Sequence, residues 1–129
     1  MTSRAGAILA VADVGRSVAF YGEVLGFEVE ALYDDPPYAT LALAGMRLSL
    51  AEQGHAAEDR PGVDLEAPRD SGKANALLVL EVDDAPAEHA RLGELGVGFL
   101  ADPYQPPWGG CRFFCVDPDG YLVEIEQPA

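Results

Sequence analysis

The chain has 129 residues, 49% of them apolar, enough for a single domain, residues 1–129, with its own core. Its 22 acids against 8 Lys and Arg give a formal net charge of −14, which argues against nucleic acid as a partner. No apolar run approaches the roughly 20 residues that span a bilayer. The N-terminal stretch is typical of a first strand rather than a signal peptide, so we expect no membrane partner and a cytoplasmic location.

The sequence repeats one pattern at an offset of about 70 residues. Two motifs recur in the same register: Leu25-Gly26 with Leu95-Gly96, and Pro36-Pro37-Tyr38 with Pro106-Pro107-Trp108. Several matches in one register indicate two copies of one structural unit, and each copy predicts a strand, a helix and three strands. The copies span residues 5–52 and 74–129. Between them, the polar stretch 53–73 is rich in Pro and Gly and predicts a linker or a flap.

Each predicted helix carries a start and a stop signal. In the first copy Asp13 is suited to cap the helix, and Gly26 is suited to end it. The apolar residues between them recur at helical spacing: Val14, Val18, Tyr21 and Leu25. In the second copy Asp84 and Gly96 have these roles, and Pro86 lies at an early position, where a missing N–H is tolerated.

The last two strands of each copy are predicted to form a hairpin. Met46–Leu50 and Tyr121–Ile125 alternate in polarity, and they follow tight turns at Gly45 and Asp119-Gly120. This pattern is typical of strands with one buried face.

Cys111 and Cys115 are expected to be small apolar residues of a strand. Their spacing separates the α-carbons by roughly 13 Å, too far for a disulfide. A nucleophilic Cys115 would need an activating base that the sequence does not show. For His89 we expect a position on the helix surface rather than a role as general base.

A pair of such units, with VxD-x-x-x-S-x-x-FY in the first and WG…DPDG…VE in the second, resembles the vicinal oxygen chelate superfamily. This family includes glyoxalase I, extradiol dioxygenases and bleomycin-resistance proteins. The resemblance covers the chain outside stretch 53–73. It implies an α+β fold, in which two βαβββ modules form a cup-shaped mixed sheet with helices on its outer face. It also implies a homodimer.

Enzymes of this family typically hold a divalent metal in the cup. The resemblance places the ligand positions at Gly6, Ser49, Leu77 and Glu124. The only histidines, His55 and His89, lie elsewhere in the pattern. A catalytic metal centre needs three or four converging ligands, which Glu124 alone does not supply. We therefore predict no metal and no other cofactor.

Strand alternation predicts that Glu124 faces the cup, with Arg112 and Phe114 on the same side. Arg112 is then a counter-charge for the carboxylate, which would be costly to bury alone. The alternative is an Arg–Glu pair that only joins two strands. Arg47 is a second candidate partner, although we expect it on the face opposite to Ser49.

Aromatic residues are the more suggestive feature of the cup. Tyr38 and Trp108 hold equivalent positions, and Tyr104 and Phe114 lie nearby in the sequence. Such rings stack on planar ligands, and Trp also attracts cations; the alternative is that they pack the rim. Three acidic residues would favour a cationic ligand if they line the mouth, or are simply solvated: Asp34, Asp35 and Asp102.

Metal-free members of the family bind bleomycin, phleomycin or mitomycin without chemistry, and they are similar to this chain in length, acidity and the PWG–DPDG segment. The resemblance therefore implies a metal-independent protein that sequesters an aromatic or cationic small molecule, an antibiotic for example, in a dimer cleft. The predicted ligand-binding residues are Tyr38, Ser49, Tyr104, Trp108, Arg112, Phe114 and Glu124. Two alternatives stay open: a lyase or isomerase in which a cup carboxylate moves a proton, and a regulatory subunit that binds protein.

Overall fold

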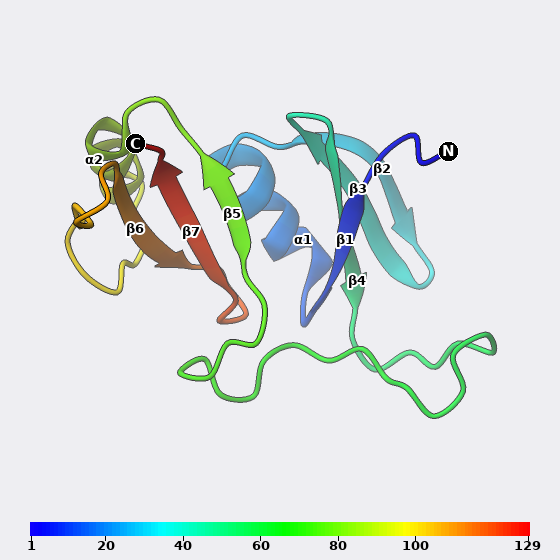
Figure 1. Cartoon of the computed structure of the whole chain (residues 1–129). Helices are drawn as coiled ribbons and strands as arrows, with labels where there is room; N and C mark the ends of the chain where they lie inside the picture. The colour runs from blue at the N-terminus through cyan, green and yellow to red at the C-terminus, as the bar shows by residue number, and fades with distance from the viewer. The chain divides into compact units, whose positions relative to one another are not determined.

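The computed structural model describes residues 1–129, and its backbone divides into two compact units, Met1–Ala67 and Pro68–Ala129. The division falls inside the stretch 53–73 that separates the two sequence copies. Each unit contains its own small sheet and its own helical segment (Figure 1). The α+β class predicted from the sequence is confirmed. None of the helices has the length and apolar character needed to cross a bilayer.

Unit 1 follows the predicted order of one strand, one helical segment and three strands. Its elements are β1 (Gly6–Val11), α1 (Val14–Val18), the π-helical η1 (Ala19–Val24), β2 (Glu28–Asp34), β3 (Pro37–Leu43) and β4 (Met46–Glu52). The strand order is β1-β4-β3-β2, with β1 parallel to β4 and the other neighbours antiparallel. The buried side chains of this sheet are apolar: Ala39, Leu41, Leu48 and Leu50 among them. They form the core under α1.

The first helix begins and ends as its sequence predicts. The Asp13 side chain accepts a hydrogen bond from the Arg16 backbone N–H (3.0 Å), and Gly26 follows the helix with φ +88°. Three of the four predicted apolar positions are buried: Val14, Tyr21 and Leu25. The spacing predicted the helix correctly, but Val18 is only half-buried, while Ser17 is fully buried. Positions i+3 and i+4 border the same helix face, so the packing, rather than the spacing, selects between these two neighbours.

Unit 2 contains β5 (Leu78–Glu81), α2 (Ala85–Glu94), β6 (Cys111–Val116) and β7 (Leu122–Gln127). The strand order is β5-β7-β6, with β5 parallel and β6 antiparallel to β7. Asp84 caps α2 by accepting from the Ala87 N–H at 3.0 Å, and Gly96 has φ +81°. Both end signals of the second helix are therefore confirmed.

The strand predicted between Gly96 and Pro106 does not form as a continuous strand. This segment pairs with β6 only through two isolated bridges, Phe99 with Cys115 and Tyr104 with Arg112. Pro103 lies between the two bridges and lacks the N–H that a ladder needs. The second unit is therefore a three-stranded sheet with a long segment lying along one edge.

The turn between β6 and β7 forms as predicted. The buried Asp117 side chain accepts from the backbone N–H groups of Asp119 (2.9 Å) and Tyr121 (2.8 Å), and Gly120 has φ +91°. Left-handed backbone at this position favours glycine. The turn fixes the register of β6 against β7, and this register positions the side chains of the site described below.

His89 differs from the prediction, because it does not lie on the open helix surface. Its ring stacks on Phe99 with a centroid separation of 4.1 Å and meets the edge of Phe113 at 5.0 Å. Phe113 is 2% exposed and packs against α2, as alternation predicted. The imidazole is therefore a half-buried packing residue between the helix and β6.

Candidate ligand-binding site

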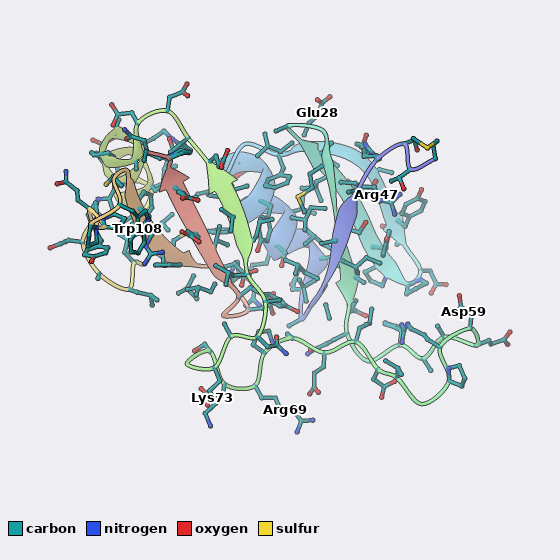
Figure 2. All side chains as sticks on the ribbon, in the orientation of Figure 1. Glu28, Arg47, Asp59, Arg69, Lys73 and Trp108 are labelled. Atoms are coloured by element: carbon teal, nitrogen blue, oxygen red, sulfur yellow. The ribbon has the colours of Figure 1, made fainter.

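A tight loop carries Trp108 to the edge of β6. The backbone N–H of Tyr104 donates to the Arg112 carbonyl (2.8 Å) and the Arg112 N–H donates to the Tyr104 carbonyl (2.9 Å), which closes residues 105–111 into a loop. Gly110 has φ +80°, and a Cβ there would collide with the backbone at the end of β7. The glycine therefore lets the loop pass close to the sheet, with Trp108 beside β6 (Figure 2).

Arg112 lies among three aromatic rings. Its Cζ atom is 5.5 Å from the ring centroid of Phe114 and 5.8 Å from those of Tyr104 and Trp108. The Nε atom is buried and has no hydrogen-bond partner, although 34% of the side chain is exposed. Cation–π attraction to the rings stabilises the guanidinium in this position. The rings thus already surround a cation that belongs to the protein.

Glu124 completes this group, and we call Tyr104, Trp108, Arg112, Phe114 and Glu124 the Arg112 cluster. In the β6–β7 register Glu124 is opposite Phe114, so it shares a sheet face with Arg112 as a diagonal neighbour. Its Oε1 atom is 3.7 Å from Nη1 of Arg112, and its side chain is 14% exposed. The predicted contact is present as an ion pair, but at this distance it is not a hydrogen bond.

The outer surface of the Arg112 cluster is aromatic and open to solvent. Trp108 is 70% exposed and Tyr104 is 51% exposed. Flat ring faces exposed side by side are suited to stacking on a planar ligand. The geometry therefore offers a planar surface next to a guanidinium and a carboxylate.

Tyr38 and Ser49, the other two predicted site residues, belong to unit 1. Tyr38 is opposite Tyr33 in the β2–β3 register, with ring centroids 6.0 Å apart. Ser49 is 1% exposed, and its Oγ accepts from Nε of Arg47 at 3.2 Å. The prediction that Arg47 and Ser49 lie on opposite faces was wrong, because residues two apart on a strand share a face.

A cavity of about 460 Å³, open to solvent, lies on the sheet of unit 1, and all of its lining residues except Ser49 are exposed. Its lining comes from the N-terminal segment, β1 and β4: Ser3, Arg4, Ala5, Gly6, Ala7, Ile8, Arg47 and Ser49. Sequence reasoning identified Ser49 and considered Arg47, but it missed Arg4. Arg4 precedes the first strand, where no periodicity or motif marks a residue as part of a site.

The metal of the family does not fit the residues found here. Of the four implied ligand positions, only Glu124 carries a carboxylate or imidazole group. A Cβ at Gly6 would collide with the carbonyl oxygen of Arg47 on β4, so a larger ligand there would require the strands to move apart. No three His, Cys, Asp or Glu side chains gather in the chain in a way that could hold a metal ion.

Cys115 also lacks the properties of a nucleophile. Both cysteines are free and buried, and desolvation raises the pKa of the Cys115 thiol to about 11. A thiol with a raised pKa stays protonated near neutral pH, and the thiolate is the reactive form.

Comparison with known proteins shows the family to which the chain is similar. Residues 5–125 match the family model described as the Glyoxalase/Bleomycin resistance protein/Dioxygenase superfamily. Lactoylglutathione lyase of Salmonella typhimurium is 32% identical over 127 residues, covering 92% of this chain and 87% of the relative.

Two solved structures from Streptomyces sp. CB03234 are similar over nearly the full length. The antibiotic binding protein TnmS3 has a TM-score of 0.73 and 26% identity, covering 100% of this chain and 98% of its own. A glyoxalase/bleomycin resistance protein has a TM-score of 0.67 and 27% identity, covering 97% of this chain and 100% of its own. The matches thus include both an enzyme name and a binding-protein name.

Proposed function

This chain belongs to the Glyoxalase/Bleomycin resistance protein/Dioxygenase superfamily, and we propose that it binds a planar aromatic small molecule at the Arg112 cluster without a metal ion. The observation that carries the proposal is the buried, unpartnered Nε of Arg112 beneath exposed aromatic rings. An unsatisfied buried donor costs free energy, and a ligand acceptor that reaches the guanidinium as the exposed loop adjusts would recover it.

The position of Arg112 favours an aromatic ligand over a cationic one. A cation approaching the rings of Tyr104 and Trp108 would meet a guanidinium only 5.8 Å from both centroids. Like charges at such separations repel, more strongly where water is excluded. The net charge of −14 attracts cations to the molecule as a whole, but the local charge at the cluster is set by Arg112 and Glu124.

The relatives support sequestration as the role of this binding. TnmS3, 26% identical, is described as an antibiotic binding protein. We extend this to the present chain as a homodimer that holds an antibiotic-like aromatic compound unchanged in the cytoplasm. Sedimentation of the purified protein tests the dimer separately from the ligand.

A fluorescence titration tests the binding itself. The chain has one Trp, Trp108, so its emission reports on the Arg112 cluster alone. Uncharged planar antibiotics, those of the mitomycin type included, should quench it and saturate at micromolar concentration or below, about 8 kcal/mol of binding free energy, whereas cationic compounds of the bleomycin type should bind more weakly. The compound should be recovered unchanged. Arg112→Gln should weaken binding, and Arg69→Gln, with the same loss of charge outside the cluster, should not.

A lyase is the second candidate, favoured by the 32% identity to lactoylglutathione lyase. Glu124 is the one residue here suited to move a proton, since it is mostly buried and its Arg112 contact leaves its oxygens without a short hydrogen bond. Incubation with methylglyoxal and glutathione, from which lactoylglutathione forms, tests this candidate. Turnover that is lost in Glu124→Gln and kept in Glu126→Gln, a matched change on the same strand, would assign the chain to the enzymes.

A further inference from the structure

The cavity of unit 1 has a charge opposite to that of the chain. Its lining includes two of the eight basic residues, Arg4 and Arg47, together with two serines, and it includes no acid. Chance would favour acids in a chain with 22 of them. This concentration of donors lies wholly within unit 1, so it does not depend on the Arg112 cluster or on the function proposed above.

Arg47 is held in place by the sheet, with its outer nitrogens free. Its Nε donates to Oγ of the buried Ser49 at 3.2 Å, and its backbone N–H donates to the Ala5 carbonyl at 3.1 Å. The side chain is exposed and its two Nη groups make no hydrogen bond within the chain, although its charge is close enough to Glu30 to help lower the pKa of that carboxyl. Ser49 is 1% exposed, so its hydroxyl positions Nε of Arg47 rather than reaching a ligand itself. Arg47 lies beside β1, near the N-terminal segment (Figure 2).

Arg4 is the other basic residue of the lining, and a ligand can replace its ion-pair partner, Glu30. Its Nη1 is 3.0 Å from Oε2 of Glu30, and both side chains are 38% exposed. Glu30 lies at a register shift of β2 between Val29 and Ala31. An exposed ion pair of this kind contributes little free energy, so another anion can compete with Glu30.

We propose that this cavity binds an oxyanion, the carboxylate or phosphate group of a small molecule, through Arg47 and Arg4, with Ser49 positioning Arg47. A guanidinium presents paired N–H donors that match both groups, so the shared chemistry is a planar or tetrahedral oxyanion. The volume of about 460 Å³ is within the range of small-molecule pockets. Small side chains at Ala5, Gly6 and Ala7 leave room for the ligand beside β1.

Titration of the full chain by ¹H–¹⁵N NMR tests this assignment. Inorganic phosphate and acetate are added in separate series at constant ionic strength, with chloride as the balancing salt. The Nε–H signal of Arg47 and the amide signals of Gly6 and Ser49 should shift and saturate in at least one series. The series that saturates at lower concentration identifies the group as phosphate or carboxylate.

Three variants make the test specific. Arg47→Gln should weaken the affinity about tenfold or more, as expected for a lost charged hydrogen bond. Glu30→Gln should strengthen it roughly two- to threefold by releasing Arg4. Arg69→Gln, which removes the same charge outside the cavity, should leave it unchanged. The spectra also report whether each variant is folded, and Arg47→Lys provides a milder change if Arg47→Gln is not.

The proposal is overturned if the shifts grow linearly without saturation, since that indicates screening alone. It is equally overturned if Arg69→Gln weakens the response as much as Arg47→Gln. An unchanged affinity in Glu30→Gln would remove Arg4 from the site. None of these results depends on Trp108 fluorescence, so failure here is distinguishable from failure of the Arg112 cluster to bind a planar ligand.

Discussion

Units 1 and 2 repeat one sequence pattern, yet they place an arginine in opposite surroundings. In unit 1, Arg47 is fixed by a serine in a cavity lined by small side chains, with its Nη groups unpaired. In unit 2, Arg112 lies among three rings with a carboxylate 3.7 Å away. The strands are common to both units. The residues around each arginine determine whether its guanidinium can bind an anion or is packed against groups of the protein.

The largest predicted effect distinguishes two glycines with similar backbone angles. Gly110 in unit 2 has φ +80° and a Cβ there would collide with the β7 end, whereas Gly45 in unit 1 has φ +83° and open space around it. Gly110→Ala should cost about 3 kcal/mol of unfolding free energy, from strain plus collision. Gly45→Ala should cost about 1 kcal/mol, from strain alone.

Denaturant unfolding measures both changes. Trp108 emission should also shift in Gly110→Ala, because the loop that carries it is displaced. Equal costs for the two alanines would show that the Trp108 loop is not held against β7 and would weaken the account of the Arg112 cluster.

The second prediction is that each of the two arginines determines the affinity of one site only. Arg112→Gln should weaken binding of a planar ligand about tenfold or more, and should leave oxyanion binding at Arg47 unchanged. Arg47→Gln should do the reverse. Fluorescence and NMR titrations of both variants with both probes measure the four affinities. Loss of both activities in either variant would mean that the two sites are not independent.

Much of this comparison follows from the sequence, because its signals are local. The caps at Asp13 and Asp84 and the turn glycines at Gly26 and Gly120 depend on a few neighbouring residues. The contact of Arg112 with Glu124 follows from strand alternation once the hairpin turn fixes the register. Local rules therefore predicted most of the elements, and strand alternation placed three of the five members of the Arg112 cluster on one face: Arg112, Phe114 and Glu124.

Other features depend on contacts between distant segments, which no local pattern carries. The pairing of Arg4 with Glu30 requires the N-terminal segment and β2 to meet, and nothing in either segment signals the other. The position of His89 depends on Phe99, which lies in the segment where a strand was expected. That strand is reduced to two bridges, because the prolines of the segment oppose ladder formation more strongly than its apolar residues favour it.

The third prediction uses a probe found only in unit 2. Burial raises the pKa of Cys115 to about 11, above the 9.0 of an ordinary thiol. The unfolded chain then binds fewer protons than the folded chain between these pH values. The contribution of this thiol to stability should be complete below about pH 9 and decline as the pH rises toward 11.

Denaturant unfolding from about pH 8 to about pH 11 measures this decline, with Cys115→Ala as the control that should lose it. Alkylation by iodoacetamide near neutral pH should also be slow in the folded protein and fast after unfolding. Rapid alkylation of folded protein would show that the core of unit 2 opens easily.

The smallest predicted effect concerns the exposed ion pair of unit 1. The hydrogen bond from Arg4 lowers the pKa of Glu30 below its ordinary 4.5. A depressed carboxyl pKa stabilises the folded chain above the unfolded value, and this contribution is lost as the pH falls through the folded pKa. ¹³C NMR of the Glu30 carboxyl group should show the low pKa, and Arg4→Gln should return it toward 4.5.

A saturating oxyanion should raise the pKa of Glu30, as Arg4→Gln does, because it competes with Glu30 for the guanidinium of Arg4. The pKa of Glu30 should therefore rise when phosphate, which stays anionic in this pH range, fills the cavity, and it should not rise in chloride at equal ionic strength. By linkage, protonation of Glu30 should in turn strengthen oxyanion binding at low pH, as long as the ligand itself stays ionised. If the pKa of Glu30 does not change when the ligand binds, Arg4 is not part of the binding site and Arg47 is its only cation.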